Sequence, residues 1–202
     1  MQAVVFDFNG TLSDDEPVLA RIYRELLPDL TVDEYYARYA GHTDEYIFDG
    51  DEGLIAERVR RYVELCADGS TVDEGTRAAV RLAAGRIPVG VVSAALRAEI
   101  DPVLTAAGLL DLFRIVIAQD DVTRGKPDPQ PYLLAAERLG IPPAELTVFE
   151  DTDVGVASAR AAGAHVVGVT RTLGAERLRE ADELVDAIDV EVMERLLEPL
   201  CS

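Results

Sequence analysis

The chain has 202 residues, of which 49% are hydrophobic and 28% are charged, a composition typical of globular proteins. Its formal net charge is -19, and there is no basic stripe to neutralise a nucleic-acid backbone, so we expect no nucleic-acid partner. No run of about 18 apolar residues occurs, which argues against a membrane span. Cys66 and Cys201 fit neither a metal motif nor a disulfide framework, and no basic leader precedes the first apolar run. We therefore expect a cytoplasmic monomer.

The first apolar run, Ala3–Phe8, predicts a strand. The segment 13–86 that follows it contains helical patterns only, at Glu16–Leu27, Val32–Tyr39, Leu54–Cys66 and Glu74–Ala84. We interpret this segment as a helical cap inserted after the first strand, so that residues 1–12 and 87–202 form the catalytic domain. The cap contains an acidic run, which is interpreted as a solvated face: Asp44, Glu45, Asp49, Asp51 and Glu52.

The rest of the chain alternates short apolar runs with helical patterns. The predicted strands are Pro88–Ser93, Arg114–Ala118, Leu146–Phe149 and His165–Val169, the last with a buried histidine. The predicted helices are Arg97–Ala107, Pro129–Leu139, Val154–Ala162 and the C-terminal Val190–Leu200. Strands that alternate with helices in this way predict an α/β fold, a Rossmann-like parallel-sheet sandwich with an inserted α-helical cap. Ligands of such sheets bind at the carboxyl ends of the strands.

Four polar motifs follow the predicted strands, and the sheet would gather them at one edge. They are Asp7-x-Asn9-Gly10-Thr11, Ser93 with Ala94, Lys126 in Gly125-Lys126-Pro127, and Glu150-Asp151. An aspartate can attack a phosphoryl group, and neighbouring carboxylates can hold Mg²⁺. A serine hydroxyl and an ammonium can stabilise the transferring oxygens. Of the 19 lysine and arginine residues only Lys126 is a lysine, which favours a role that a planar guanidinium cannot fill.

In their order and flanking residues these motifs resemble the haloacid dehalogenase-like superfamily, in the branch of beta-phosphoglucomutase and phosphoglycolate phosphatase. The resemblance rests on Gly125-Lys126-Pro127-Asp128-Pro129, on Val148-Phe149-Glu150-Asp151-Thr152 and on Gly155 through Gly163. It covers the sheet domain almost end to end, whereas the cap matches only in position, size and helical character.

The resemblance implies a phosphatase that acts on a small phosphorylated substrate through Asp7 as nucleophile. It implies that Ser93 and Lys126 bind phosphate, helped by the neighbouring groups Asn9, Gly10, Thr11 and Ala94. It also implies a Mg²⁺ cofactor held by Asp7, Asp151 and the main-chain carbonyl of Asn9, with Glu150 in support. In the cap, His42 and Thr43 are candidate substrate contacts, although a lone histidine is more often structural.

Asn9 departs from the family pattern, because most phosphatases of the superfamily have an aspartate two residues after the nucleophile. That aspartate transfers protons, which an amide cannot do, and such help is worth about 10²–10⁴ in rate. Three explanations stay open: a natural variant of low or specialised activity, a deliberate Asp-to-Asn substitution, or deamidation of the Asn9-Gly10 pair.

The alternatives to a phosphatase are a sugar phosphate mutase and a catalytically weak protein that binds or senses a phosphorylated ligand. A dehalogenase would use Asp7 but would not need the acidic pair Glu150-Asp151.

Overall fold

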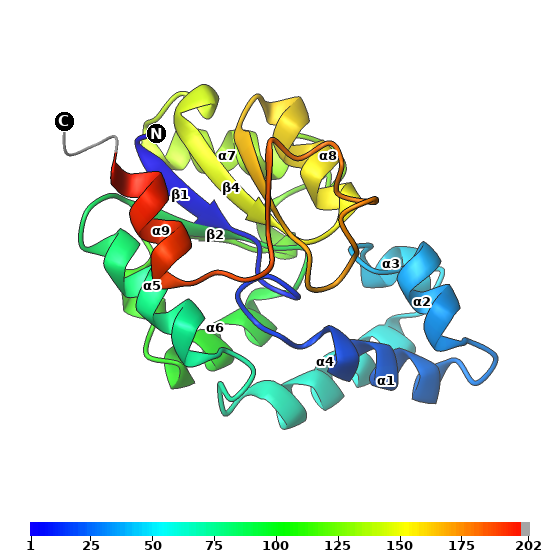
Figure 1. Cartoon of the computed structure of the whole chain (residues 1–202). Helices are drawn as coiled ribbons and strands as arrows, with labels where there is room; N and C mark the ends of the chain where they lie inside the picture. The colour runs from blue at the N-terminus through cyan, green and yellow to red at the C-terminus, as the bar shows by residue number, and fades with distance from the viewer. Residues whose placement is uncertain (199–202) are drawn as a thin grey trace.

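The computed structural model describes residues 1–198, which form a parallel sheet flanked by helices (Figure 1). Residue Cys201 and the predicted end of the last helix at Leu200 lie outside the described residues. The strands are β1 (Ala3–Phe6), β2 (Val89–Val92), β3 (Ile115–Ile117), β4 (Leu146–Glu150), β5 (His165–Val169) and β6 (Glu183–Val185). The helices are α1 (Glu16–Leu26), α2 (Val32–Arg38), α3 (Asp44–Ile47), α4 (Glu52–Cys66), α5 (Glu74–Ala84), α6 (Arg97–Ala106), α7 (Gln130–Leu139), α8 (Asp153–Ala162) and α9 (Val190–Leu197).

The strand order is β3-β2-β1-β4-β5-β6, and every neighbouring pair is parallel. Strand β1 lies at the centre, with Phe6 opposite Val91 of β2 and Phe149 of β4. The predicted α/β fold is therefore confirmed. The short edge strand β6 was missed, because Glu183–Val185 is too short and too polar to stand out as an apolar run.

The two faces of the sheet are covered by different helices, and the alternation of side chains along β1 shows why. Val4 and Phe6 pack into the core under α5, α6 and α9, whereas Ala3 and Val5 pack into the core under α7 and α8. All four side chains are fully buried. Strand β1 is apolar throughout because helices cover both faces, as in other parallel sheets. It therefore forms a rigid base for the loop that follows it.

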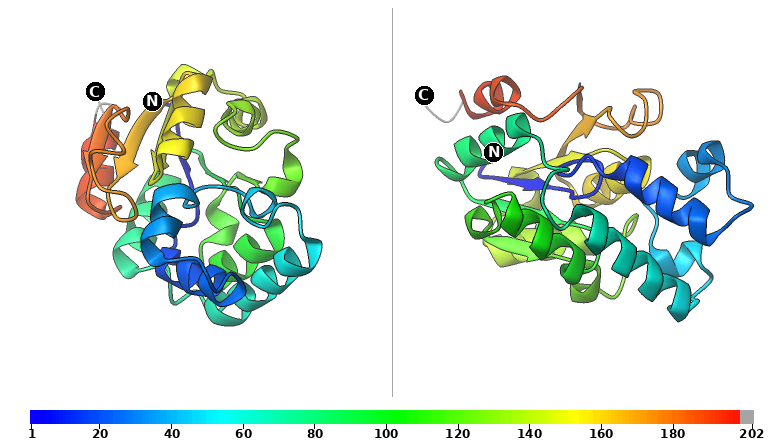
Figure 2. Two further views of the ribbon diagram at one scale, coloured as in Figure 1. Left: turned by 90° about the vertical axis from the view of Figure 1, so that its right-hand side faces the viewer. Right: turned by 90° about the horizontal axis from the view of Figure 1, so that it is seen from below.

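Helices α1 to α4 stand beyond the carboxyl ends of the strands, at the lower right of Figure 1 and at the right of the right-hand view of Figure 2. We call residues 14–71 the cap. The chain enters the cap after Ser13 and leaves it at Thr71, and these two points of the chain are in contact. The Ser13 hydroxyl donates to Thr71 Oγ1 at 2.7 Å, and the main-chain N–H of Asp14 donates to the Thr71 carbonyl at 2.8 Å.

Two sequence-based assignments need correction. Helix α5 lies within the predicted cap segment 13–86, but it packs against β2 and α9 and so belongs to the sheet layers. Its buried residues Ala79, Val80 and Ala83 join the core under the sheet, which accounts for this position. His165 was expected to be buried, yet it is exposed at the first position of β5.

Candidate active site

The loop after β1 places Asp7 at the carboxyl edge of the sheet. The main-chain N–H of Asp7 donates to the Phe149 carbonyl at 2.9 Å, which extends the pairing of β1 with β4 by one step. Gly10 adopts φ 71°, and a Cβ there would collide with the carboxylate of Asp151. Only glycine therefore allows the loop to approach Asp151 so closely. Gly10 acts as a spacer beside the acidic pair.

Lys126 is buried between two carboxylates from different strands. Its Nζ donates to Asp7 Oδ1 and Glu150 Oε1, and to the Val92 carbonyl at 3.2 Å. Burial alone would lower the pKa of Lys126, but the carboxylates of Asp7 and Glu150 outweigh burial and raise it. The side chain therefore carries its positive charge at neutral pH, directly beside the predicted nucleophile.

The carboxyl groups of Asp7, Glu150 and Asp151 offer oxygens that lie within 4.8 Å of one another. Burial raises the pKa of Asp7 to about 7 although the Lys126 ammonium opposes the rise, and burial followed by the charge of Asp7 raises that of Asp151. The Thr11 hydroxyl donates to Asp151 Oδ1 at 3.1 Å. Among the described residues, no donor reaches the buried Oδ2 of Asp151 or the buried Oε2 of Glu150.

Buried carboxylate oxygens without a donor are costly, and a cation is the natural partner for them. The oxygens available as metal ligands are hard carboxylate oxygens at the carboxyl ends of two different strands, β1 and β4. Mg²⁺ prefers ligands of this kind. The residues present therefore fit a magnesium ion.

Glu150 has a second function, because its Oε1 accepts from Lys126 and from the Tyr132 hydroxyl and so holds the lysine in place.

A cavity of about 550 Å³, including its opening to solvent, lies between this edge and the cap. It contains the predicted residues Asp7, Asn9, His42, Ser93, Ala94, Lys126 and Asp151. Gly10, Thr11 and Glu150 are not among the residues that line it, and Thr43 lines a neighbouring hollow beside Ser93 and Lys126.

Ser93 follows β2 and faces the same cavity as Asp7. Its main-chain N–H donates to the Ile117 carbonyl at 2.9 Å, which fixes the residue to the end of β3. Its Oγ accepts from the Ala95 N–H at 3.0 Å, so the hydroxyl hydrogen remains for an acceptor in the cavity. This geometry suits a phosphate oxygen.

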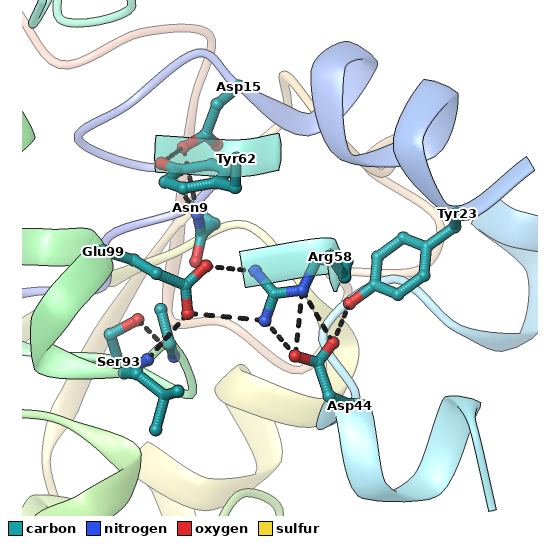
Figure 3. A network of polar contacts seen from close by, with 10 residues as sticks. Asn9, Asp15, Tyr23, Asp44, Arg58, Tyr62, Ser93 and Glu99 are labelled. Carbon is teal, nitrogen blue, oxygen red and sulfur yellow. Dashed lines mark hydrogen bonds and ion pairs between the residues drawn. The ribbon is translucent and has the colours of Figure 1, made fainter. Parts of the chain in front are cut away.

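Asn9 is bonded to a carboxylate that the sequence did not single out. Its Nδ2 donates to Asp15 Oδ2 at 2.9 Å and lies 3.3 Å from the Tyr62 hydroxyl, which itself donates to Asp15 (Figure 3). The N–H of Gly10 donates to the other oxygen of Asp15 at 3.1 Å. Asp15 is fully buried and surrounded by donors, so the environment suits an amide at position 9 and disfavours a second carboxylate there.

The cap supplies four further polar side chains that line the cavity and were also missed: Glu16, Tyr23, Tyr35 and Arg58. The Tyr35 hydroxyl donates to Glu16 Oε2 at 3.0 Å. Burial, and then the charge of Asp15, raise the pKa of Glu16 to about 8. Arg58, Tyr62 and Cys66 are the buried residues of α4, and their four-residue spacing places them on one side of that helix. That spacing was a usable signal, because an arginine in line with apolar residues is unusual on a solvated helix.

Arg58 joins the cap to the sheet layers (Figure 3). Its guanidinium forms ion pairs with Asp44 of α3 and with Glu99 of α6, and the Tyr23 hydroxyl donates to Asp44. Asp44 is 3% exposed, so its assignment to a solvated acidic face was wrong. The arginine accounts for the burial of this carboxylate, since buried charges are normally paired.

Comparison with known proteins agrees with this geometry. The family model for haloacid dehalogenase-like hydrolases matches residues 1–163. The validoxylamine A 7'-phosphate phosphatase of Streptomyces hygroscopicus subsp. limoneus is 34% identical in an alignment of length 198 that covers 91% of this chain and 92% of that protein. The fructose-1-phosphate phosphatase of Escherichia coli (strain K12) is 29% identical in an alignment of length 183 that covers 82% of this chain and 95% of that protein.

Among solved structures, a beta-phosphoglucomutase from Clostridium difficile superposes with a TM-score of 0.84 at 20% identity, covering 100% of this chain and 99% of that one. The parallel sheet, the polar groups at its carboxyl edge and the phosphatase relatives together define the protein as a phosphohydrolase. The chain belongs to the haloacid dehalogenase-like hydrolase family.

Proposed function

We propose that the protein is a magnesium-dependent phosphatase of small phosphorylated carbohydrates that acts through an aspartyl-phosphate on Asp7. The observation that carries the proposal is the placement of Asp7 in contact with Lys126 and within 4.8 Å of carboxylate oxygens of Glu150 and Asp151, in a cavity between the sheet edge and the cap. The names of the phosphatase relatives support a phosphorylated carbohydrate as the substrate.

Each residue has a definite task in this reaction. The Asp7 carboxylate attacks phosphorus, the bond to the leaving oxygen breaks, and that oxygen takes a proton from solvent water. A second water then attacks phosphorus, the bond between phosphorus and Asp7 breaks, phosphate leaves and the excess proton returns to solvent. Lys126 and Ser93 donate to the phosphoryl oxygens as charge develops on them. Magnesium, held by Asp7, Asp151 and the carbonyl of Asn9, would neutralise charge on the same oxygens.

Asn9 limits this chemistry, because an amide neither protonates the leaving oxygen nor deprotonates water. Its Nδ2 donates to Asp15 and to the Tyr62 hydroxyl, which leaves its carbonyl to orient a hydroxyl or a water. A mutase needs proton transfer in both half-reactions, so the amide favours hydrolysis over a mutase reaction. A protein that only binds a phosphorylated ligand would show no turnover with magnesium.

The test is a rapid-quench assay with an aryl phosphate, whose leaving group needs no protonation. We expect a burst of released phenol close to the enzyme concentration, then slow turnover, with a phosphorylated enzyme detected by mass. An Asp7→Asn variant should show neither the burst nor the mass shift. Rapid steady hydrolysis of alkyl phosphates would show that another residue transfers the proton. Glu16 would then be the first to test, because it lines the cavity and its raised pKa of about 8 keeps it protonated at neutral pH.

A further inference from the structure

We call the part of the cavity that is lined by Glu16, Tyr23, Tyr35, Asp44 and Arg58 the cap end. The net charge of these side chains limits which substrates the cavity accepts. Among the described residues that line the cavity, only Lys126 and Arg58 carry a fixed positive charge. Lys126 lies at the phosphate end, bonded to Asp7 and Glu150. Within this described lining, Arg58 is therefore the only fixed cation that could meet a second anionic group of a substrate.

Both forked edges of the Arg58 guanidinium are already paired with carboxylates, the Nε–Nη2 edge with Asp44 and the Nη1–Nη2 edge with Glu99. Its Nε donates to Asp44 at 2.9 and 3.0 Å, its Nη2 donates to Asp44 again, and its Nη1 donates to Glu99 (Figure 3). The two carboxylates are 3% and 0% exposed on their side chains. One guanidinium between two carboxylates leaves a net negative charge in a buried place, where charge interactions are screened weakly.

The other polar groups at this end add no positive charge. Glu16 is either a neutral carboxyl or a carboxylate, and Tyr23 and Tyr35 already donate their hydroxyl hydrogens to Asp44 and Glu16. Burial lowers the pKa of His42, so its imidazole is neutral at pH 7. The cap end thus presents acceptor oxygens and aromatic surfaces, which suit hydroxyl and ammonium groups and repel anions.

We propose that the substrate is a phosphomonoester whose remaining part carries hydroxyl or amino groups and no second anionic group. This inference rests on the proposed phosphatase function and narrows it. It excludes bisphosphates and phosphorylated carboxylic acids as good substrates, because their second anion would be buried against Asp44, where the Arg58 guanidinium is already paired. An ammonium group in the same place would be attracted.

Two matched pairs of substrates test the proposal in the wild-type protein with magnesium: the acyclic pair sorbitol 6-phosphate and 6-phosphogluconate, which differ by a carboxylate, and the cyclic pair glucose 6-phosphate and glucosamine 6-phosphate, which differ by an ammonium. We expect kcat/KM for 6-phosphogluconate to be lower than for sorbitol 6-phosphate by about tenfold or more, as for one like charge held nearby. Glucosamine 6-phosphate should equal or exceed glucose 6-phosphate. For any compound that is not turned over, its inhibition constant against p-nitrophenyl phosphate gives the same ranking.

A variant tests the cause. Asp44→Asn leaves one side of the Arg58 guanidinium without a carboxylate, so the ratio of kcat/KM for 6-phosphogluconate to kcat/KM for sorbitol 6-phosphate should rise by about fivefold or more. Glu52→Gln is the matched control, since it removes the same charge from an exposed position of the cap and should leave the ratio unchanged. The wild-type comparison needs no variant and stands even if Asp44→Asn fails to fold.

The outcomes separate this inference from the function on which it rests. A kcat/KM of the wild-type protein for 6-phosphogluconate that equals or exceeds the value for the matched neutral substrate would overturn the inference. The proposed phosphatase function would still stand. Absence of any hydrolysis, including that of p-nitrophenyl phosphate, would overturn both.

Discussion

Asn9 and Asp15 form a pair in which the amide and the carboxylate depend on each other. Asn9→Asp alone would place two carboxylates where a donor and an acceptor now lie 2.9 Å apart. We therefore expect Asn9→Asp to lower the melting temperature and to give little of the rate gain of about 10²–10⁴ that an acid–base group provides. The double variant Asp15→Asn with Asn9→Asp should regain the wild-type melting temperature and should show the rate gain that an acid–base group provides.

A double-mutant cycle on these two positions measures the coupling by urea unfolding and by steady-state hydrolysis of an alkyl phosphate. We expect a coupling free energy of about 0.5–3 kcal/mol, the usual range for residues in direct contact. Strictly additive effects would contradict the pairing. They would also reopen the alternative that the asparagine is a replacement placed among neighbours suited to an aspartate.

Lys126 is the second residue whose identity is tested directly. Lys126→Arg should reduce kcat/KM nearly as much as Lys126→Ala, by about 10²–10³, because a planar guanidinium does not fit between Asp7 and Glu150. Arg124→Lys is the matched control, since it makes the reverse exchange on an exposed side chain of the same loop. Near-normal turnover of Lys126→Arg would show that the pocket needs only a positive charge.

Glu16 couples stability to pH. Burial, and then the charge of Asp15, raise its pKa from 4.5 to about 8, so the folded protein holds a proton that the unfolded chain has lost. The free energy of unfolding should thus fall as pH rises from about 4.5 to 8, by about 1.4 kcal/mol per pH unit for this one proton. Glu16→Gln should remove that part of the slope in urea titrations with EDTA, whereas Glu52→Gln should retain it. Identical slopes in wild type and Glu16→Gln would contradict the raised pKa.

At the scale of elements, Arg58 of α4 links the cap to α6 through Glu99. Arg58→Met should lower the free energy of unfolding by about 3–5 kcal/mol, because it leaves two buried carboxylates unpaired. Arg60→Met on the same helix should cost less than about 1 kcal/mol, since Arg60 pairs with Glu57 and Glu64 in solvent. The measurement is urea unfolding of both variants, and equal losses would show that the buried network contributes no more than surface pairs.

The helices and strands also show which parts of the fold can be predicted from sequence patterns. The long amphipathic helices and the apolar strands were predicted, because their periodicity is set by faces that are buried uniformly. Strand β6 and the place of α5 were not, since the first has almost no apolar run and the second depends on which surface its apolar side meets. The motif residues Asp7 and Lys126 were predicted from their places after strands to lie at one edge of the sheet, and their side chains are in contact there. Asp15 and Arg58 were missed because their roles arise only from neighbours distant in sequence.

At the scale of the whole molecule, magnesium should raise the melting temperature, because a ligand that binds only the folded state stabilises it by about 2.7 kcal/mol at 100 times its Kd. Asp151→Asn should abolish this rise, and in EDTA it should be at least as stable as wild type, since it removes a buried carboxylate oxygen without a donor. Differential scanning fluorimetry with and without magnesium is sufficient, with Glu52→Gln as the control that retains the rise. An unchanged rise in Asp151→Asn would exclude this residue as a ligand.

Among the described residues, no helix is both long and apolar enough to cross a bilayer.

The contact between Ser13 and Thr71 has a consequence for how such a protein diversifies. The chain leaves the sheet layers and re-enters them at one point, where two hydroxyls 58 positions apart are joined at 2.7 Å. A segment whose two ends meet can be lengthened, shortened or exchanged for another without moving either end, as with other insertions between adjacent termini. Transplanting residues 14–71 into a relative should accordingly transfer its preference among substrates while the recipient keeps its own nucleophile. Substrate recognition by the cap and the reaction at the edge of the sheet can thus evolve independently of each other.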